Sequence, residues 1–203
     1  MPYNRTQLIA QARQLLNDGT GLFWTDPELG DWVDQGTLDV STKGRCVEFG
    51  TPILLQPNLN FYTAPSGAIG IEAVVYSTDG KALANLRLRQ FGHVSAGNDN
   101  RASSYAHYGN TLYFFPVPGI QEAVTVFYWV STTTVDLLPD GYETLVLLYV
   151  LKMARLKEQR YAEAAQLNAM YLAELQFQRN DLQDREPDSK EKLRLPDRIV
   201  RNG

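Results

Sequence analysis

The spacing of apolar residues changes twice along this 203-residue chain, and that change constrains the fold most. Residues 5–44 carry the three- and four-residue spacing of amphipathic helices, and residues 46–131 are rich in β-branched and aromatic residues. Helical spacing returns after residue 136. With 44% apolar residues the chain can bury a core. We therefore predict an α+β fold: a small α-helical bundle, two helices from each end of the chain, with an inserted antiparallel β-sheet region.

Two capping patterns mark the N-terminal helices. Asn4 with Gln7 resembles a capping box, and Thr25 with Glu28 repeats the pattern before the second helix. Because glycine often follows a helix end, we expect Gly44 to lie just beyond the second helix.

The middle of the chain predicts short strands joined by tight turns. Asp79-Gly80, Gly109-Asn110 and Pro118-Gly119 suit such turns, which favours antiparallel pairing. Between the strands, residues 92–104 are small and polar and predict a long loop. The predicted strands are 46–55, 70–77, 81–91, 110–115 and 123–131.

The last predicted strand, AVTVFYWV at 123–130, has apolar residues on both faces. Such a strand is covered on both sides. The second cover is either the protein's own helices or a neighbouring subunit.

Two further helices are expected after the sheet, at about 142–159 and 162–184. Ala162, Ala165 and Ala169 suggest a close-packed face between them, as in an antiparallel hairpin. No glycine or proline marks a turn near Arg160, so a single bent helix is the alternative. The predicted divisions are 1–44 for the N-terminal helices, 45–135 for the β region, 136–184 for the helical hairpin and 185–203 for an extended C-terminal arm.

The residues give little indication of catalysis. Cys46 has no histidine near it in the sequence, and His93 and His107 stand in or beside the loop, so no cluster has metal-ligand spacing. We expect no enzymatic activity, no metal and no cofactor, with a hydrolase that uses His93 or His107 as a less favoured alternative. The longest apolar run, Leu145–Leu151, is too short to cross a membrane, and no secretory signal is visible.

Nucleic-acid binding has one local indication. Arg87, Arg89 and Arg101 surround the loop, and Tyr105 and Tyr108 follow it. A basic patch with aromatic residues can contact a backbone and stack on bases. Outward arginines on an edge strand explain the same pattern, and we favour that explanation.

Taken together, three stretches resemble the head-to-tail adaptor proteins of tailed bacteriophages, including the tail tubular A proteins. They are TQLIAQARQLLND…FWTDPELGDWVDQG, YGNTLYFFPVPGIQEAVTVFYWVS, and LLPDGYETLVLLYVLKMARLKEQRYAEAAQLNAMYLAELQ. We interpret the second as a hairpin of the inserted sheet and the third as the closing helical pair. The resemblance spans most of the chain.

The resemblance implies a non-catalytic virion protein at the head–tail interface, present in the host cytoplasm during assembly. Such adaptors form a ring, usually of twelve subunits, under the portal. The ring extends the DNA channel and provides the attachment site for the tail or the next tail component, a nozzle or stopper. DNA passes without sequence-specific binding. A helical-hairpin interaction scaffold is the alternative, although the chain has no internal repeat.

In such adaptors a C-terminal arm lodges against the portal, and this implies a role for residues 185–203. From Lys190 onward the net charge is +3, which leaves −7 for the rest of the chain. Charged residues can set the register of the arm on the portal, and sparse apolar residues can anchor it there. An idle, solvated terminus is the alternative. The candidate docking residues are Lys190, Lys192, Leu193, Arg194, Leu195, Arg198, Ile199, Val200 and Arg201.

Ring closure needs two different surfaces on each subunit. The sheet with two apolar faces and the helical pair are the candidate surfaces. The loop is a candidate contact with a neighbour or the tail. Its candidate residues are His93, Asn98, Arg101, Tyr105 and Tyr108.

Overall fold

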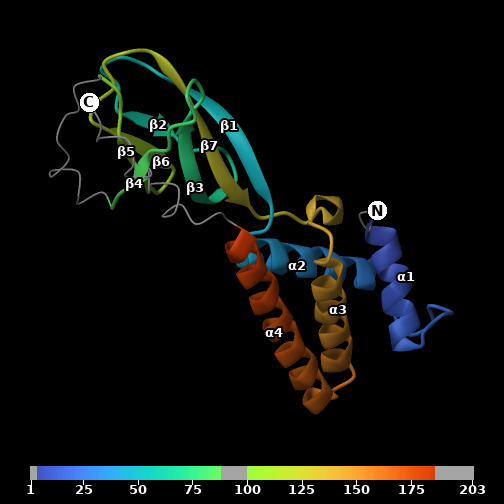
Figure 1. The fold of residues 1–203 in the computed structure, drawn as a ribbon. Coiled ribbons are helices and arrows are strands. Elements are labelled where there is room, and N and C mark those ends of the chain that lie inside the picture. The colour runs from blue at the N-terminus through green and yellow to red at the C-terminus, as the bar shows by residue number, and fades with distance from the viewer. Residues whose placement is uncertain (1–3, 88–99, 186–203) are drawn as a thin grey trace, which may run out of the picture.

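The structure, a computed structural model, describes residues 4–87 and 100–185, and for 181–185 only the backbone (Figure 1). Helices and strands occupy separate parts of the molecule, and the strands lie between the second and third helices in the sequence. The predicted α+β class is confirmed. The helices are α1 (Arg5–Leu16), α2 (Asp26–Gly44), α3 (Glu143–Lys157) and α4 (Tyr161–Arg185).

All four helices contribute to one hydrophobic core. Its side chains include Leu8 of α1, Val33 of α2, Leu145 of α3 and Tyr171 of α4, each at most 1% exposed. Burial of a side chain of this size stabilises the fold by about 1.5–3 kcal/mol. The helices from the two ends of the chain therefore depend on one another for their burial.

The capping patterns define the helix starts as predicted. Asn4 and Gln7 form a reciprocal capping box, and the Thr25 side chain accepts a hydrogen bond from the Glu28 N–H. The predicted end of α2 was wrong by one residue. Gly44 is the last helical residue, and a Cβ there would lie 3.3 Å from the Tyr142 ring, so packing explains this glycine. Arg45 adopts the left-handed cap instead, with φ 50°.

The C-terminal helices form a hairpin, not one bent helix. Gln159 turns the chain with φ 61°, between the end of α3 and the start of α4. The predicted contact face of α4 was wrong, because Ala162, Ala165 and Ala169 are exposed. Among the α4 side chains that the structure describes, up to Asn180, the buried ones are Ala164, Tyr171 and Leu175.

The β part consists of two sheets. One has the order β1-β7-β3, and the other has the order β2-β6-β5-β4. Their inner faces meet in a second core that includes Val74, Tyr105, Phe114 and Val126. The strands are β1 (Glu48–Leu55), β2 (Phe61–Thr63), β3 (Ala68–Tyr76), β4 (Ala84–Asn85), β5 (Ser104–Tyr108), β6 (Thr111–Phe115) and β7 (Glu122–Val130).

The strand pairing differs from the prediction in three ways. β6 and β7 do not form a hairpin, since each belongs to a different sheet. The hairpin is β5–β6, with Gly109-Asn110 at its turn and Gly109 at φ 58°. β4 pairs with β5 in parallel, although the prediction was antiparallel throughout, and the strand expected at 81–91 is limited to β4 within the described residues.

The two faces of β7 have different environments. Val124, Val126 and Tyr128 point into the sandwich and are buried. On the outer face, Phe127 is 38% exposed, and its ring lies over Gly50 of β1, where a Cβ would be 3.2 Å away. Within the described part of the chain this face is only partly covered, so the predicted second cover is incomplete.

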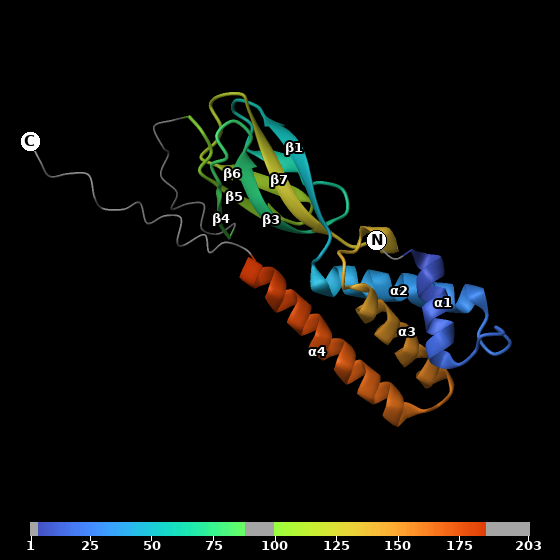
Figure 2. The same ribbon diagram turned by 45° about the vertical axis from the view of Figure 1, so that its right-hand side comes forward.

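The chain enters and leaves the β part at one place, which both Figure 1 and Figure 2 show beside the C-terminal end of α2. The Val130 N–H donates to the Val47 carbonyl at 3.0 Å. The Ser41 hydroxyl donates to the Thr132 carbonyl at 3.1 Å and accepts the Thr132 N–H at 3.0 Å. The returning segment is therefore tied to α2. Among the described helices, none has the length and apolar character of a membrane span.

Candidate functional site

The predicted docking arm lies outside the described residues. The structure describes its point of attachment, the C-terminal half of α4, as far as Arg185. Every arm residue predicted to dock, from Lys190 to Arg201, follows that point in the sequence.

The predicted contact loop is described in part. His93 and Asn98 lie outside the described residues, as does Arg89. Tyr105 is only 1% exposed and belongs to the core of the sandwich, whereas Tyr108, at the end of β5, is 68% exposed. Burial raises the pKa of Tyr105 to about 12. Of the residues expected to contact a partner, Tyr108 is thus accessible and Tyr105 is not.

Arg101 is held by two carboxylates of its own chain. Its Nε donates to Glu122 at 2.6 Å, and its Nη1 donates to Asp79 at 2.7 Å. The guanidinium also lies 4.2 Å from the centre of the Tyr76 ring. Hydrogen bonds from Arg101 lower the pKa of both Glu122 and Asp79. The arrangement joins the β3–β4 turn to the start of β7, and it commits the guanidinium to a structural role.

We expect Arg101→Met to lower the melting temperature most at neutral pH. A carboxyl pKa that is lowered in the folded state contributes stability above its unfolded value of about 4, and this is lost as pH falls through the folded pKa. The difference from the wild type should therefore shrink below about pH 4. Thermal unfolding from pH 3 to 7, with Arg179→Met on α4 as control, measures this. A pH-independent difference would contradict the assignment.

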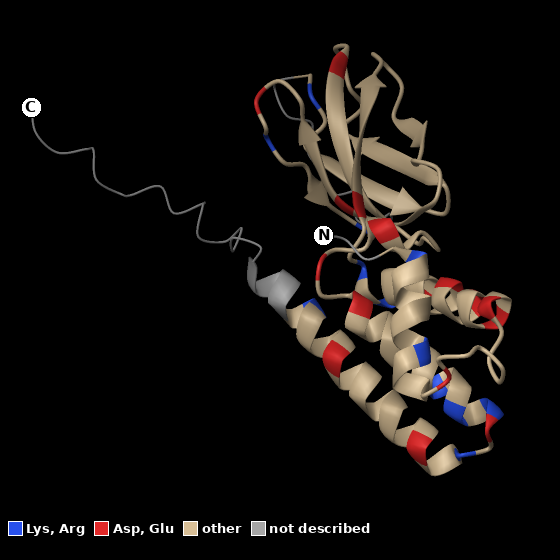
Figure 3. Cartoon of the chain, turned by 90° about the vertical axis from the view of Figure 1, so that its right-hand side faces the viewer, with Lys and Arg blue, Asp and Glu red and all other residues tan. Residues whose placement is uncertain are grey.

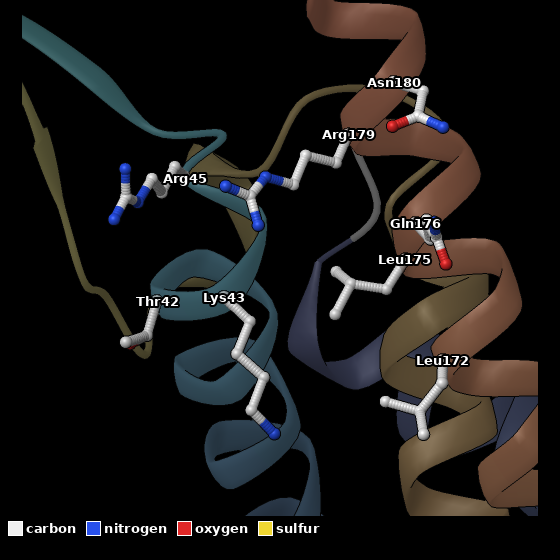
Figure 4. A pocket seen from close by; sticks show the side chains of 8 residues that line it. All are labelled: Thr42, Lys43, Arg45, Leu172, Leu175, Gln176, Arg179 and Asn180. Atoms are coloured by element: carbon white, nitrogen blue, oxygen red, sulfur yellow. The ribbon is translucent and has the colours of Figure 1, made fainter.

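A groove lies between the C-terminal end of α2 and the C-terminal half of α4 (Figure 4), with a volume of about 670 Å³. We call it the α2–α4 groove. In Figure 4 the apolar side chains of Leu172 and Leu175 project from α4 toward α2, and Arg179 extends toward the end of α2. Its lining residues are Thr42, Lys43, Arg45, Leu172, Leu175, Gln176, Arg179 and Asn180.

The α2–α4 groove combines three cations with an apolar floor. Lys43 pairs with Asp39 at 2.8 Å, and the Arg45 guanidinium lies 5.1 Å from the centre of the Trp129 ring. Both cations remain exposed. Since the lining has Lys and Arg but no Asp or Glu, the groove suits a ligand that is acidic and partly apolar.

The sequence analysis missed the α2–α4 groove, although a signal was present. Residues 26–39 carry five acidic residues and no Lys or Arg, whereas residues 40–45 carry Lys43 and Arg45 and no acid. This separation of charge shows that the two ends of α2 have different electrostatic environments. The contribution of Arg179 is not visible in the sequence, because it depends on how α4 packs on α2.

The loop between α1 and α2 is built around one buried carboxylate. Asp18 is 8% exposed and accepts hydrogen bonds from three successive backbone N–H groups, those of Leu22, Phe23 and Trp24, at 3.2, 3.4 and 2.8 Å. Arg13 lies 3.3 Å from Asp18. These hydrogen bonds, the one from Trp24 first, lower the pKa of Asp18.

Two large apolar side chains project from this loop. Leu22 is 88% exposed and Phe23 is 62% exposed, whereas the next residue, Trp24, is 1% exposed and packs against Trp32. We call Leu22 and Phe23 the α1–α2 tip. Sequence reasoning missed it, because adjacent aromatic residues with opposite burial have no distinguishing pattern.

Cys46 is 8% exposed, and burial raises its thiol pKa to about 12. Cys46 is therefore a buried core residue, and its thiol is protonated at neutral pH. His107, the other residue considered for catalysis that is described, lies in β5 opposite Leu112. Within the described chain, no three His, Cys, Asp or Glu residues are grouped to hold a metal ion.

Comparison with known proteins identifies the family. Among solved structures, the neck of an empty GTA particle, computed with C6 symmetry, is similar to this chain, with 14% sequence identity and a TM-score of 0.26 over 70% of this chain and 74% of that one. No curated protein matches the chain. A family match extends over residues 3–196 and confirms the predicted resemblance to phage adaptors. The chain belongs to the SU10 adaptor protein family.

Proposed function

We propose that this protein joins the head of a tailed-phage particle to its tail, as a ring under the portal. The observation that carries this proposal is the family match over residues 3–196. The protein acts by binding alone, without a catalytic step, metal or cofactor. It is located at the head–tail interface of the virion and in the host cytoplasm during assembly.

The ring contains twelve copies, extends the DNA channel below the portal and provides the attachment site for the tail, nozzle or stopper. Heterologous contacts between copies generate closed rings when the rotation between neighbours closes. The family's adaptor role favours this arrangement.

The C-terminal arm contacts the portal above the ring. The net charge of +3 from Lys190 onward and the four apolar anchors of the arm, Leu193, Leu195, Ile199 and Val200, support this role. A segment that folds on a partner gains affinity from a few buried anchors, and its charges set register. The cations Lys190, Lys192, Arg194, Arg198 and Arg201 are the proposed register-setting residues.

The loop at 92–104 contacts a neighbouring copy or the tail through His93, Asn98 and Tyr108. Of the three candidate contact residues that the structure describes, Arg101, Tyr105 and Tyr108, Tyr108 is the exposed one. Arg101 and Tyr105 support the loop from within the sandwich, through the carboxylate contacts and the core packing described above.

DNA passes through the ring without sequence-specific contacts. The chain before Lys190 has a net charge of −7, and Figure 3 shows acidic positions on both the helical and the β part. A ring multiplies the charge of each copy, so an acidic channel would not retain phosphates. An atomic structure of the assembled ring in which Lys and Arg predominate along the channel would contradict this part of the proposal.

Co-sedimentation with portal-bearing, DNA-filled heads tests the function. We expect the full chain to sediment with the heads of its phage and to add a ring of density below the portal in electron micrographs. Heads without a portal are the control, and they should retain none. Equal retention on both kinds of head, or no retention on portal-bearing heads, would reject the adaptor proposal.

A further inference from the structure

The exposed α1–α2 tip is a preformed surface. Three backbone N–H groups of the loop donate to Asp18, and Trp24 anchors the end of the loop in the core. Leu22 points outward, and the Phe23 ring packs edge-on against the Trp24 ring, with 4.5 Å between ring centres, yet stays 62% exposed; exposure of both side chains is unfavourable in water. Because the loop is already ordered, binding through it costs little conformational entropy. A partner that covers these two side chains is the physical reason to hold them there.

The α2–α4 groove is a matching surface on the same chain. Leu172 is 49% exposed at its edge, and Leu175 lies deeper and is 8% exposed. An apolar floor of this kind accepts an apolar side chain; Lys43 and Arg179 lie beside it, and Arg45 lines the outer edge, where its side chain extends away from α4 over Trp129 (Figure 4). The volume of about 670 Å³ is within the usual range for binding pockets.

The charges beside the two surfaces are opposite. Beside the tip, the first turns of α2 carry Asp31, which is exposed, and Asp26, whose Oδ1 pairs with Arg13 at 2.6 Å while its side chain stays 73% exposed. Acidic residues at a helix start also stabilise the helix by interacting with its dipole, so they have a structural role in the isolated chain. The dipole does not account for the exposed Leu22 beside them, whereas a groove with an apolar floor and cations at its edge would accept an apolar side chain and approach an exposed carboxylate.

The two surfaces lie at opposite ends of α2. The tip precedes the first residue of this helix and the groove includes its last turn, about 28 Å away for 19 residues. Figures 1 and 2 both show the α1–α2 loop and the C-terminal end of α4 on opposite sides of the helical part. A contact between the tip of one copy and the groove of another is therefore head-to-tail, as a ring requires.

We infer that the α1–α2 tip of each copy inserts into the α2–α4 groove of the next copy. Leu22 and Phe23 would cover the apolar floor at Leu172, and Asp26 and Asp31 would approach the cations of the groove. This inference rests on the proposed ring and identifies the contact that closes it.

Disulfide cross-linking on portal-bearing heads tests the inference. A chain with both Phe23→Cys and Gln176→Cys should give a ladder of covalent multimers on a non-reducing gel. In the double variant each copy carries a cysteine on both surfaces, so cross-links can continue from copy to copy. In a mixture of the two single variants each copy has only one of the two cysteines, so cross-linking should stop at dimers. Either single variant alone should stay monomeric, because Cys46 is buried. A double variant that is retained as a ring without cross-linking would overturn the inference.

Surface variants give an independent measurement. We expect Leu22→Ser with Phe23→Ser, and separately Leu172→Asp with Arg179→Glu, to reduce the copies retained per head at least tenfold. Phe61→Ser, at a residue 56% exposed on β2, is the matched control and should leave retention unchanged. Unchanged circular dichroism would show that each variant folds.

The outcomes separate this inference from the proposed function. Failure of the wild-type chain to bind heads would reject the ring and the contact together. Normal retention of both surface variants would reject the contact alone. Loss of retention in the groove variant but not in the tip variant would also overturn the inference, since the groove would then hold the arm or the portal.

Discussion

Ending the chain at Asp184 should lower its affinity for portal-bearing heads by about 100-fold or more, equivalent to about 2.7 kcal/mol. The deletion removes all four proposed apolar anchors of the arm, and anchors of this kind account for most of the binding energy at an interface. The described helical and β cores use no residue after Leu175, so the shortened chain should keep its fold. Sedimentation over a range of protein concentrations measures the change.

Two full-length variants separate the apolar from the charged contribution of the arm. Replacing Leu193, Leu195, Ile199 and Val200 by serine should lower affinity nearly as much as the deletion. Replacing the five Lys and Arg residues by serine should lower it less and weaken its salt dependence, because exposed ion pairs contribute little. If the shortened chain binds as tightly as the full chain, the helical part makes the portal contact and the arm is accessory.

The second large effect is expected for Trp24→Ala, which should lower the free energy of unfolding by about 3–5 kcal/mol. Trp24 is 1% exposed, its ring lies 5.5 Å from that of Trp32, and Lys157 lies 4.9 Å from its centre. Removal of the indole leaves a cavity where the α1–α2 loop meets α2 and α3. For a chain of this size the melting temperature should fall by roughly 10 °C. Circular dichroism at increasing temperature measures it.

Leu22→Ala is the matched control, because Leu22 lies two residues away in the same loop and is 88% exposed. Its stability should stay within about 0.5 kcal/mol of the wild type. A similar loss in both variants would mean that the loop is destabilised as a whole, and that burial of the indole is not the cause.

Local capping interactions made the starts of α1 and α2 predictable, whereas the buried face of α4 depends on tertiary packing. The Asn4–Gln7 and Thr25–Glu28 patterns act within four residues and identified both N-terminal helix starts. The buried face of α4 was mispredicted, because this helix has apolar residues on several sides and its burial depends on α3 and α2. Small residues such as Ala165 are compatible with both the buried and the exposed face of this helix.

Strand pairing was predictable only where a turn determines it. Gly109-Asn110 joins two strands directly, and β5–β6 is the resulting hairpin. Pro118-Gly119 also looked like a hairpin turn, but the chain crosses there from one sheet to the other. The choice between sheets depends on contacts far apart in sequence, such as Val126 against Val74. The turn residues alone therefore could not predict that the strands form two sheets.

The candidate site was predictable in part, for a similar reason. The arm stays a prediction, because it lies outside the described residues; it was proposed from its charge and its apolar residues, which are properties of a continuous segment. The α2–α4 groove joins Lys43 to Arg179 across more than a hundred residues, so only the folded chain brings them together. The tip was not predictable, because nothing in the sequence distinguishes the exposed Phe23 from the buried Trp24 next to it.

The hydrogen-bonded crossing between the helical and β parts has a consequence for how such genes evolve. Val47 and Val130 are bonded neighbours, so the ends of the segment between them lie side by side. A foreign segment that begins and ends at such a pair can be spliced in without moving α2 or α3. We expect the helical part to tolerate replacement of the whole sandwich between these two residues, which would allow the two parts to evolve separately.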